Sequence, residues 1–344
     1  MDKPNKKHKK TSLLFFILLI AIVLMAIRYG AVYINNDEIF SSFYKLFISS
    51  ENLTLNERIF LGIRLPRAIL CLFVGASLAV GGVLMQALFR NPIVEPGLIG
   101  TSSGAAFGAS LYFVLGAVFK LNAGEWTLPI AACAGGLLST SLVFILSQTK
   151  QAGKSSIVTL LLTGIAINAL FMSGTGFLSY IARDPQARSI TFWNLGTLSG
   201  ANWNSVMIVG TSTLICIITS MFYSKHLNAL MMGEEEAQYL GINIKRLKLN
   251  VIILNVIMVA IATAFVGVIS FIGLIVPHLL RIINGSDNRL LIRNSALLGG
   301  ILLSVADLTA RTILMPAELP IGILTSIIGV PVFIVLLHKK NYFF

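Results

Sequence analysis

Four long apolar segments without a single charge limit what this chain can fold into. They are Ala68–Phe89, Gly97–Phe119, Thr127–Thr149 and Ser155–Ala182. Each is longer than the ~20 apolar residues with which an α-helix crosses about 30 Å of hydrocarbon. Over the whole chain 56% of residues are hydrophobic and 12% charged, whereas a soluble domain has roughly 25% charged residues. The sequence therefore predicts an all-α, polytopic membrane protein, a single transmembrane domain over residues 1–344.

The apolar pattern predicts about ten transmembrane helices. A lysine-rich tail over residues 1–12 precedes the first of them, but no small-residue cleavage site follows, so this span is expected to be uncleaved. The eighth and ninth spans are short, and the pattern defines their ends weakly. The expected spans are about residues 13–34, 65–87, 98–118, 127–148, 156–181, 204–223, 248–270, 272–284, 294–309 and 321–338.

The distribution of lysine and arginine sets the orientation of these spans. Seventeen of the 26 Lys and Arg residues fall on the side of the amino terminus, including the terminal pair Lys339-Lys340. Because cytoplasmic loops carry the excess of positive charge, both termini and the tail 1–12 are predicted to be cytoplasmic. The net charge of +12 then reflects topology and attraction to anionic lipid. No basic helix outside the membrane indicates a nucleic-acid partner.

The chain carries no recognisable catalytic motif. Gly153-Lys154-Ser155 ends like a phosphate-binding loop, but Gln148 stands where that loop requires glycine. The three cysteines lie far apart without the spacing of metal ligands. We therefore predict no catalytic residue, no metal site and no cofactor bound by this chain. If nucleotide drives transport, a separate chain hydrolyses it.

An ion-coupled secondary transporter is a competing function. Such proteins usually carry ionisable residues within their spans, and the predicted mid-membrane regions are almost devoid of them. This pattern weakens the ion-coupled interpretation but leaves it open, because backbone carbonyls also bind sodium.

A polar segment over 233–243 separates two predicted spans and contains three consecutive glutamates. It is either a solvated linker or a short cytoplasmic helix that receives force from a soluble motor, with glycine marking both ends. The residues that we assign to this coupling segment are Gly233, Glu234, Glu235, Glu236, Ala237, Leu240 and Gly241.

Other interruptions of the apolar pattern lie at predicted membrane boundaries. Arg64-Leu-Pro-Arg67 opens the second span, and Asp307–Arg311 closes the ninth on the same, outer side. Asn91–Gly97 follows the second span at its inner end, where two prolines predict a turn. Arginines at such boundaries often only extend into the lipid headgroups. Within the spans, Gly104-x-x-x-Gly108 predicts a close contact between helices.

Taken together, these motifs resemble a known family from about Arg58 to Lys339. The chain is similar to the permease subunits of ABC importers for iron complexes, haem and vitamin B12, which are type II importers. The motifs that carry the resemblance are Arg64–Arg67, Met85–Gly100, Gly233–Gly241, Phe271–Arg281 and Glu318–Gly322.

The resemblance implies a homodimer of ten-helix subunits around a central path. Two ATPase subunits, which use ATP and Mg, would bind the cytoplasmic side at segment 233–243. A periplasmic or lipid-anchored binding protein would dock outside, with its glutamates pairing with Arg64, Arg67 and Arg311. The cytoplasmic gates would contain Asn91, Ile93, Ile157 and Val158. The last two are apolar where the vitamin B12 permease has small hydroxyl residues.

The cargo is predicted from a second set of segments. Residues Gly164–Leu170, Gly174–Asp184 and Thr191–Gly200 are most similar to haem-importing members. A ferric siderophore or cobalamin remains the alternative, because siderophore permeases share parts of these segments. No residue is expected to ligate iron, since tight ligation would oppose release.

Overall fold

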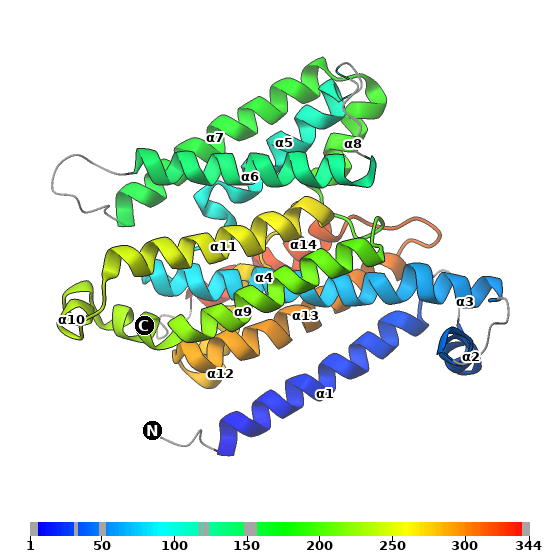
Figure 1. The fold of residues 1–344 in the computed structure, drawn as a ribbon, viewed down its shortest axis with the longest axis horizontal. Helices are drawn as coiled ribbons and strands as arrows, with labels where there is room; N and C mark the ends of the chain where they lie inside the picture. The colour runs from blue at the N-terminus through cyan, green and yellow to red at the C-terminus, as the bar shows by residue number, and fades with distance from the viewer. Residues whose placement is uncertain are drawn as a thin grey trace.

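The computed structural model describes residues 6–30, 34–47, 53–116, 119, 124–147 and 157–338, and this part of the chain contains helices and no strand. Figure 1 shows the helices as a bundle. In chain order they are α1 (Lys6–Arg28), α2 (Asn36–Phe47), α3 (Leu55–Ile59), the π-helix η1 (Phe60–Arg64), α4 (Leu65–Phe89), the 3-10 helix η2 (Pro96–Ile99), α5 (Thr101–Leu115), the 3-10 helix η3 (Gly124–Trp126), α6 (Thr127–Leu146), α7 (Ile157–Ile181), α8 (Asp184–Asn194), α9 (Trp203–Met232), α10 (Glu234–Tyr239), α11 (Ile244–Val266), α12 (Ile272–Asn284), α13 (Asn288–Thr312) and α14 (Ile321–His338).

All ten predicted spans fall on helices, so the predicted all-α membrane fold is confirmed. In the described part of the chain, seven helices are long and apolar enough to cross a membrane, and α12 and α14 are shorter apolar helices. The weakly defined eighth span coincides with α12, whereas the ninth extends beyond 294–309 to become α13. In the order of the chain, the ten predicted spans correspond to α1, α4, α5, α6, α7, α9, α11, α12, α13 and α14.

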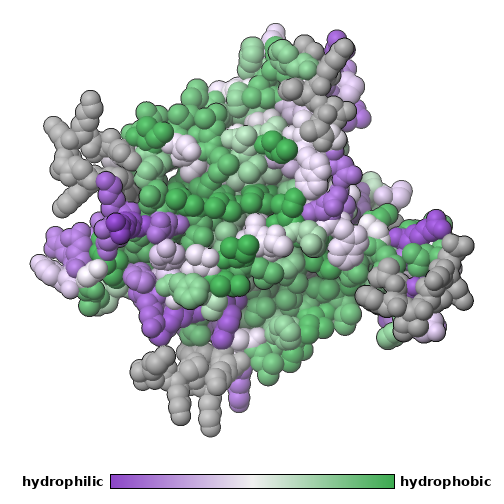
Figure 2. Space-filling view, viewed as in Figure 1, coloured by the Kyte–Doolittle hydropathy of each residue, from purple (hydrophilic) through white to green (hydrophobic). Residues whose placement is uncertain are grey.

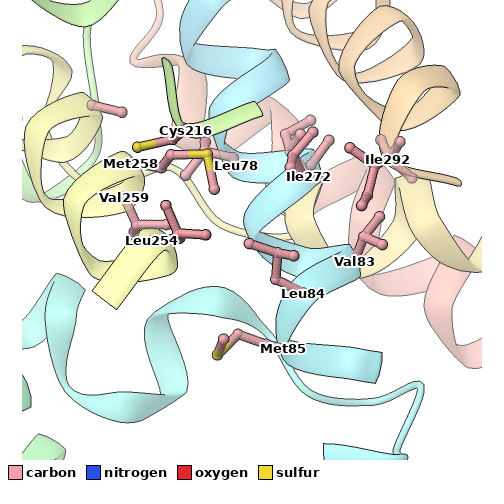
Figure 3. Packing of buried hydrophobic residues seen from close by; sticks show 14 of the residues in the cluster. Leu78, Val83, Leu84, Met85, Cys216, Leu254, Met258, Val259, Ile272 and Ile292 are labelled. Atoms are coloured by element: carbon pink, nitrogen blue, oxygen red, sulfur yellow. The ribbon is translucent and has the colours of Figure 1, made fainter. Parts of the chain in front are cut away.

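Helix α4 lies at the centre of the bundle, where α9, α11, α12 and α13 all contact it. Figure 3 shows Val83 of α4 near Ile292 of α13, and Leu78 of α4 near Met258 of α11. Close packing of this kind stabilises the fold through many small dispersion contacts. Helices α5, α6 and α7 form a second group, which joins the first mainly through contacts of α5 and α6 with α11.

Glycines permit the closest helix contacts. Gly104 and Gly108 of α5 face the backbone of Gly135 and Ala131 in α6, and a Cβ on either would overlap it. This confirms the contact that the Gly-x-x-x-Gly spacing predicts, and small residues of this kind let helix backbones approach closely in membranes.

The two ends of the bundle are polar and its middle is apolar. Helix α10 lies at one end, here called the inner end, together with the start of α1 and the end of α14; α2 and α3 lie at the opposite, outer end (Figure 1). Figure 2 shows apolar residues across the middle of this face and hydrophilic residues gathered near both ends. A bilayer would cover the apolar middle.

The first two spans differ from their predicted limits. Helix α1 begins at Lys6 and ends at Arg28, not near residue 34, so the expected basic tail 1–12 is partly helical; residues 1–5 lie outside the described part. The backbone turns away after Arg28, and the Arg64 guanidinium donates to the carbonyl oxygen of Tyr29 there. The second span begins ten residues early, because α3, η1 and α4 run on as one continuous helix, Leu55–Phe89. Thr54 and Glu57 form a capping box at its start.

The chain after α4 turns back into the bundle. The predicted turn is present, with Arg90 in the left-handed region. From Glu95 onward, however, the segment does not stay at the inner end. Pro96 packs near Gly81 in the middle of α4, and its carbonyl oxygen accepts from Asn255 in the middle of α11 (3.3 Å). Helix α5 therefore starts inside the bundle, which explains its length of only 15 residues.

Candidate functional site

The coupling segment forms a helix of its own at the inner end. Helix α10 follows Gly233, whose φ of +152° ends α9, and Gly241 with φ +80° lies just beyond it. The prediction that these two glycines limit the helix is confirmed. Such φ values cost a glycine little and other residues much.

Helix α10 is held to the bundle on one face and exposed on the other. Ala237 is fully buried, and Glu234 pairs with Lys248 of α11 at 2.8 Å. Tyr239 and Leu240, in contrast, are 89% and 66% exposed. Sequence reasoning included Leu240 but missed Tyr239, although a tyrosine beside a polar helix end is a typical residue of interfaces. The exposed face thus presents two acids and two large side chains, which suits contact with another protein.

The three outer arginines lie close together. This agrees with the prediction that segments 64–67 and 307–311 are on the same, outer side of the membrane. Arg67 donates to Asp307 at 2.8 and 3.1 Å and to Glu318 at 2.9 and 3.0 Å. Arg311 lies 3.0 Å from the other Asp307 oxygen and donates to the carbonyl of Ala26 at 3.1 Å. We call Arg64, Arg67, Arg311, Asp307 and Glu318 the outer cluster. Its three arginines and two carboxylates leave an excess of one positive charge.

Burial of the outer cluster was not predicted. Each arginine is less than a tenth exposed, Asp307 is 2% exposed, and only the Glu318 side chain reaches solvent substantially, at 42%. The arginines are therefore held by partners inside the same chain. Their role in docking a binding protein stays a prediction, and simple extension into the headgroups does not describe them.

The predicted gate residues lie apart from these two sites. Asn91 caps its own turn, since its Oδ1 accepts the backbone N–H of Ile93 at 3.0 Å. The Ile93 side chain is 41% exposed at the inner end. Val158 is exposed near the start of α7; the backbone of Ile157 begins that helix, but its side chain lies outside the described part. The gate function of these residues remains a prediction.

In the described part of the chain, no three or more His, Cys, Asp or Glu residues form a group that could hold a metal ion. Cys71 and Cys216 are buried, Cys133 is half-buried, and all three are free thiols.

Comparison with known proteins agrees with this geometry. The FecCD transport family matches residues 18–339. The chain is 40% identical to the hemin transport system permease protein HmuU of Yersinia pestis, over 94% of this chain and 95% of that protein. It is 38% identical to the cobalamin import system permease protein BtuC of Halobacterium salinarum, over 81% and 73%.

A solved structure extends the likeness to three dimensions. A metal-chelate type ABC transporter in an inward-facing conformation superposes with a TM-score of 0.83 at 30% identity, covering 96% of this chain and 99% of that one. The family match, the relatives and this structure all span most or nearly all of the chain. The chain therefore belongs to the FecCD transport family and is a permease of an ABC importer.

Proposed function

We propose that this permease imports haem, which a substrate-binding protein delivers at the outer end. The observation that carries the cargo assignment is the 40% identity over 324 residues to a hemin permease. Cobalamin is the second candidate, because a cobalamin permease is 38% identical over 285 residues. A ferric siderophore remains the third.

The proposed assembly is a homodimer with two ATPase subunits in a bacterial inner membrane. Helix α10 is the proposed ATPase contact, which places the inner end, the start of α1 and the end of α14 in the cytoplasm. The partner ATPases bind and hydrolyse ATP with Mg. The binding protein, periplasmic or lipid-anchored, meets the outer cluster. Exposure of Tyr239 and Leu240 on α10 supports this arrangement.

Uptake into vesicles tests the cargo and the energy source together. The permease, its ATPase and its binding protein are reconstituted, with ATP inside, and offered haem, a ferric siderophore or cobalamin. We expect ATP-dependent haem uptake that ionophores leave unchanged. Uptake of another cargo in its place would reassign the substrate. Uptake that stops when ionophores collapse the ion gradients, while ATP remains, would instead identify a secondary transporter.

The gate is tested by cross-linking at Ile93. We expect Ile93→Cys to cross-link between subunits in one nucleotide state and several-fold less in another, because ATP binding moves packed helices by discrete steps. The native Cys71, Cys133 and Cys216 are first replaced by alanine. Position 93 is preferred to 91, since Asn91 caps the turn through its side chain.

The matched control for this experiment is Ile145→Cys, an exposed position near the inner end of α6. It should show no nucleotide-dependent cross-link. If Ile93→Cys never links two subunits, or links them equally in every nucleotide state, the turn lines no gate and only connects α4 to η2.

A further inference from the structure

A cavity of about 360 Å³ lies at mid-depth in the bundle. Leu78 of α4 and Asn168 of α7 line it, and Asn255 of α11 holds the adjoining Pro96. Each of these residues stands near the middle of a long helix, about 15–20 Å from either end at 1.5 Å per residue. The cavity is therefore at the depth of the bilayer centre. Its polar lining comprises Glu95, Ser102, Ser103, Asn168, Thr175, Asn194 and Ser270.

Glu95 is the only ionisable residue in the described lining of this cavity. One carboxylate oxygen accepts the backbone N–H of Phe271, which immediately precedes α12, at 2.9 Å. No described Lys, Arg or His forms an ion pair with it. A helix N-terminus supplies roughly half a positive charge. The helix N-terminus therefore compensates only part of the carboxylate's negative charge. An uncompensated charge at this depth in a membrane is costly in free energy.

Glu95 is partly exposed to the cavity, and the buried carboxylates of the described chain show what compensation of such a charge looks like here. Glu57 pairs with Lys45 at 3.1 Å, and Asp307 pairs with both Arg67 and Arg311. Both lie toward the outer end, where water is near. Glu95 lies deeper and has a backbone N–H where the others have basic side chains. An intramembrane carboxylate of this kind normally marks a proton or ion site.

We propose that the Glu95 cavity is a cation site in which a proton or a sodium ion neutralises the carboxylate. For a proton, the second carboxylate oxygen carries the hydrogen. For sodium, that oxygen joins oxygens of the same cavity, such as the hydroxyls of Ser102 and Ser270. The cavity is large enough and polar enough to admit water with either ion. This inference needs only the membrane fold and does not depend on the cargo.

In the described lining, the surrounding helices offer no charged group that could neutralise Glu95 in place of a bound cation. The residues of α4, α5, α7, α8 and α11 that line the cavity carry no ionisable group. On α12 the ionisable residues are His278 and Arg281, which lie toward the inner end. His278 is about 10 Å further along the helix than Phe271. Neither lines the cavity.

Infrared spectroscopy and thermal unfolding of the purified full-length protein test the site. If the cation is a proton, wild-type protein at neutral pH shows a protonated-carboxyl band that isotope-labelled glutamate shifts and that Glu95→Gln lacks. The folded state then holds a proton that the unfolded chain releases, so the unfolding midpoint of wild type falls as pH rises. The unfolding midpoint of Glu95→Gln lacks this part of the pH dependence.

If the cation is sodium, the wild-type midpoint rises when sodium chloride replaces choline chloride at constant ionic strength, and Glu95→Gln does not respond. The control is Glu125→Gln, an exposed acid outside the cavity, which should behave as wild type in every arm. Absence of the band together with absence of a sodium response in wild-type protein overturns the proposal. Because this overturning result is measured on wild-type protein, it holds even if Glu95→Gln misfolds.

Discussion

Replacing Ala237 by Trp is expected to abolish ATP-driven cargo uptake while the protein still inserts and folds. Ala237 is fully buried on the inward face of α10, and an oversized side chain in a packed site shifts the backbone at a cost of about 1–3 kcal/mol. Helix α10 has only six residues, so it will move before the long helices do. Uptake and ATP hydrolysis by the full complex, measured together, detect the loss of coupling.

A second variant tests the same contact without disturbing the packing. Tyr239→Ala with Leu240→Ala removes two exposed side chains, and such changes usually alter folding by less than about 0.5 kcal/mol. A buried tyrosine at an interface often contributes about 2 kcal/mol or more. We therefore expect retention of the ATPase during purification to fall at least about tenfold, the factor that 1.4 kcal/mol gives.

The control for the surface variant is Tyr180→Ala. Tyr180 is 87% exposed near the outer end of α7, so it matches Tyr239 in type and exposure but lies away from the proposed ATPase contact. It should retain the ATPase fully. If Ala237→Trp and the double variant both transport normally, α10 is only a linker between α9 and α11.

Local signals made α10 and the spans predictable. Charge-free stretches such as Ala68–Phe89 identify a membrane helix from length alone. Gly233 and Gly241 mark helix limits because their backbone angles suit glycine. Both kinds of signal sit within the residues that they describe, so no knowledge of the tertiary structure is needed to interpret them.

Features that depend on distant contacts were missed. Two prolines predict a turn after α4, but only the contacts of Pro96 with α4 and α11 show that the chain re-enters the bundle and carries Glu95 inward. The mid-membrane region therefore contains an acid that a linear division into spans and loops assigns to a cytoplasmic loop. Helices α2 and α8 were missed for a different reason, because neither contains a long apolar run.

The outer cluster is the clearest case of information absent from local sequence. Arg67 meets Asp307 and Glu318, which lie 240 and 251 residues away along the chain. The shared outer side of the two segments was predictable from the span count. The pairing itself was not, and it changes how the arginines should be tested. Replacing Arg67 by Glu would place a third carboxylate beside Asp307 and Glu318, so a loss of docking could simply report a damaged fold.

Asp307→Asn is expected to destabilise the permease by about 3–5 kcal/mol, the usual effect of removing one partner from a buried ion pair. Among the described residues, Asp307 alone bridges Arg67 and Arg311, so the variant leaves Arg311 buried beside the Ala26 carbonyl without its anionic partner. The measurement is the thermal unfolding midpoint of the purified protein. A further change, Arg311→Leu, should recover part of the loss, because it removes the buried charge that Asp307→Asn leaves unpaired.

Glu318→Gln is the matched control, since it removes a carboxylate from the same cluster at a side chain that is 42% exposed. Exposed ion pairs contribute about 0–1 kcal/mol, so its midpoint should change little while any docking role of Arg67 can still be measured. The two variants separate structure from docking. If Asp307→Asn kept wild-type stability yet lost the binding protein, the cluster would be a docking surface rather than an internal clamp. If it lost stability as expected while Glu318→Gln altered the affinity for the binding protein, Arg67 would hold the fold through Asp307 and meet its partner on the Glu318 side.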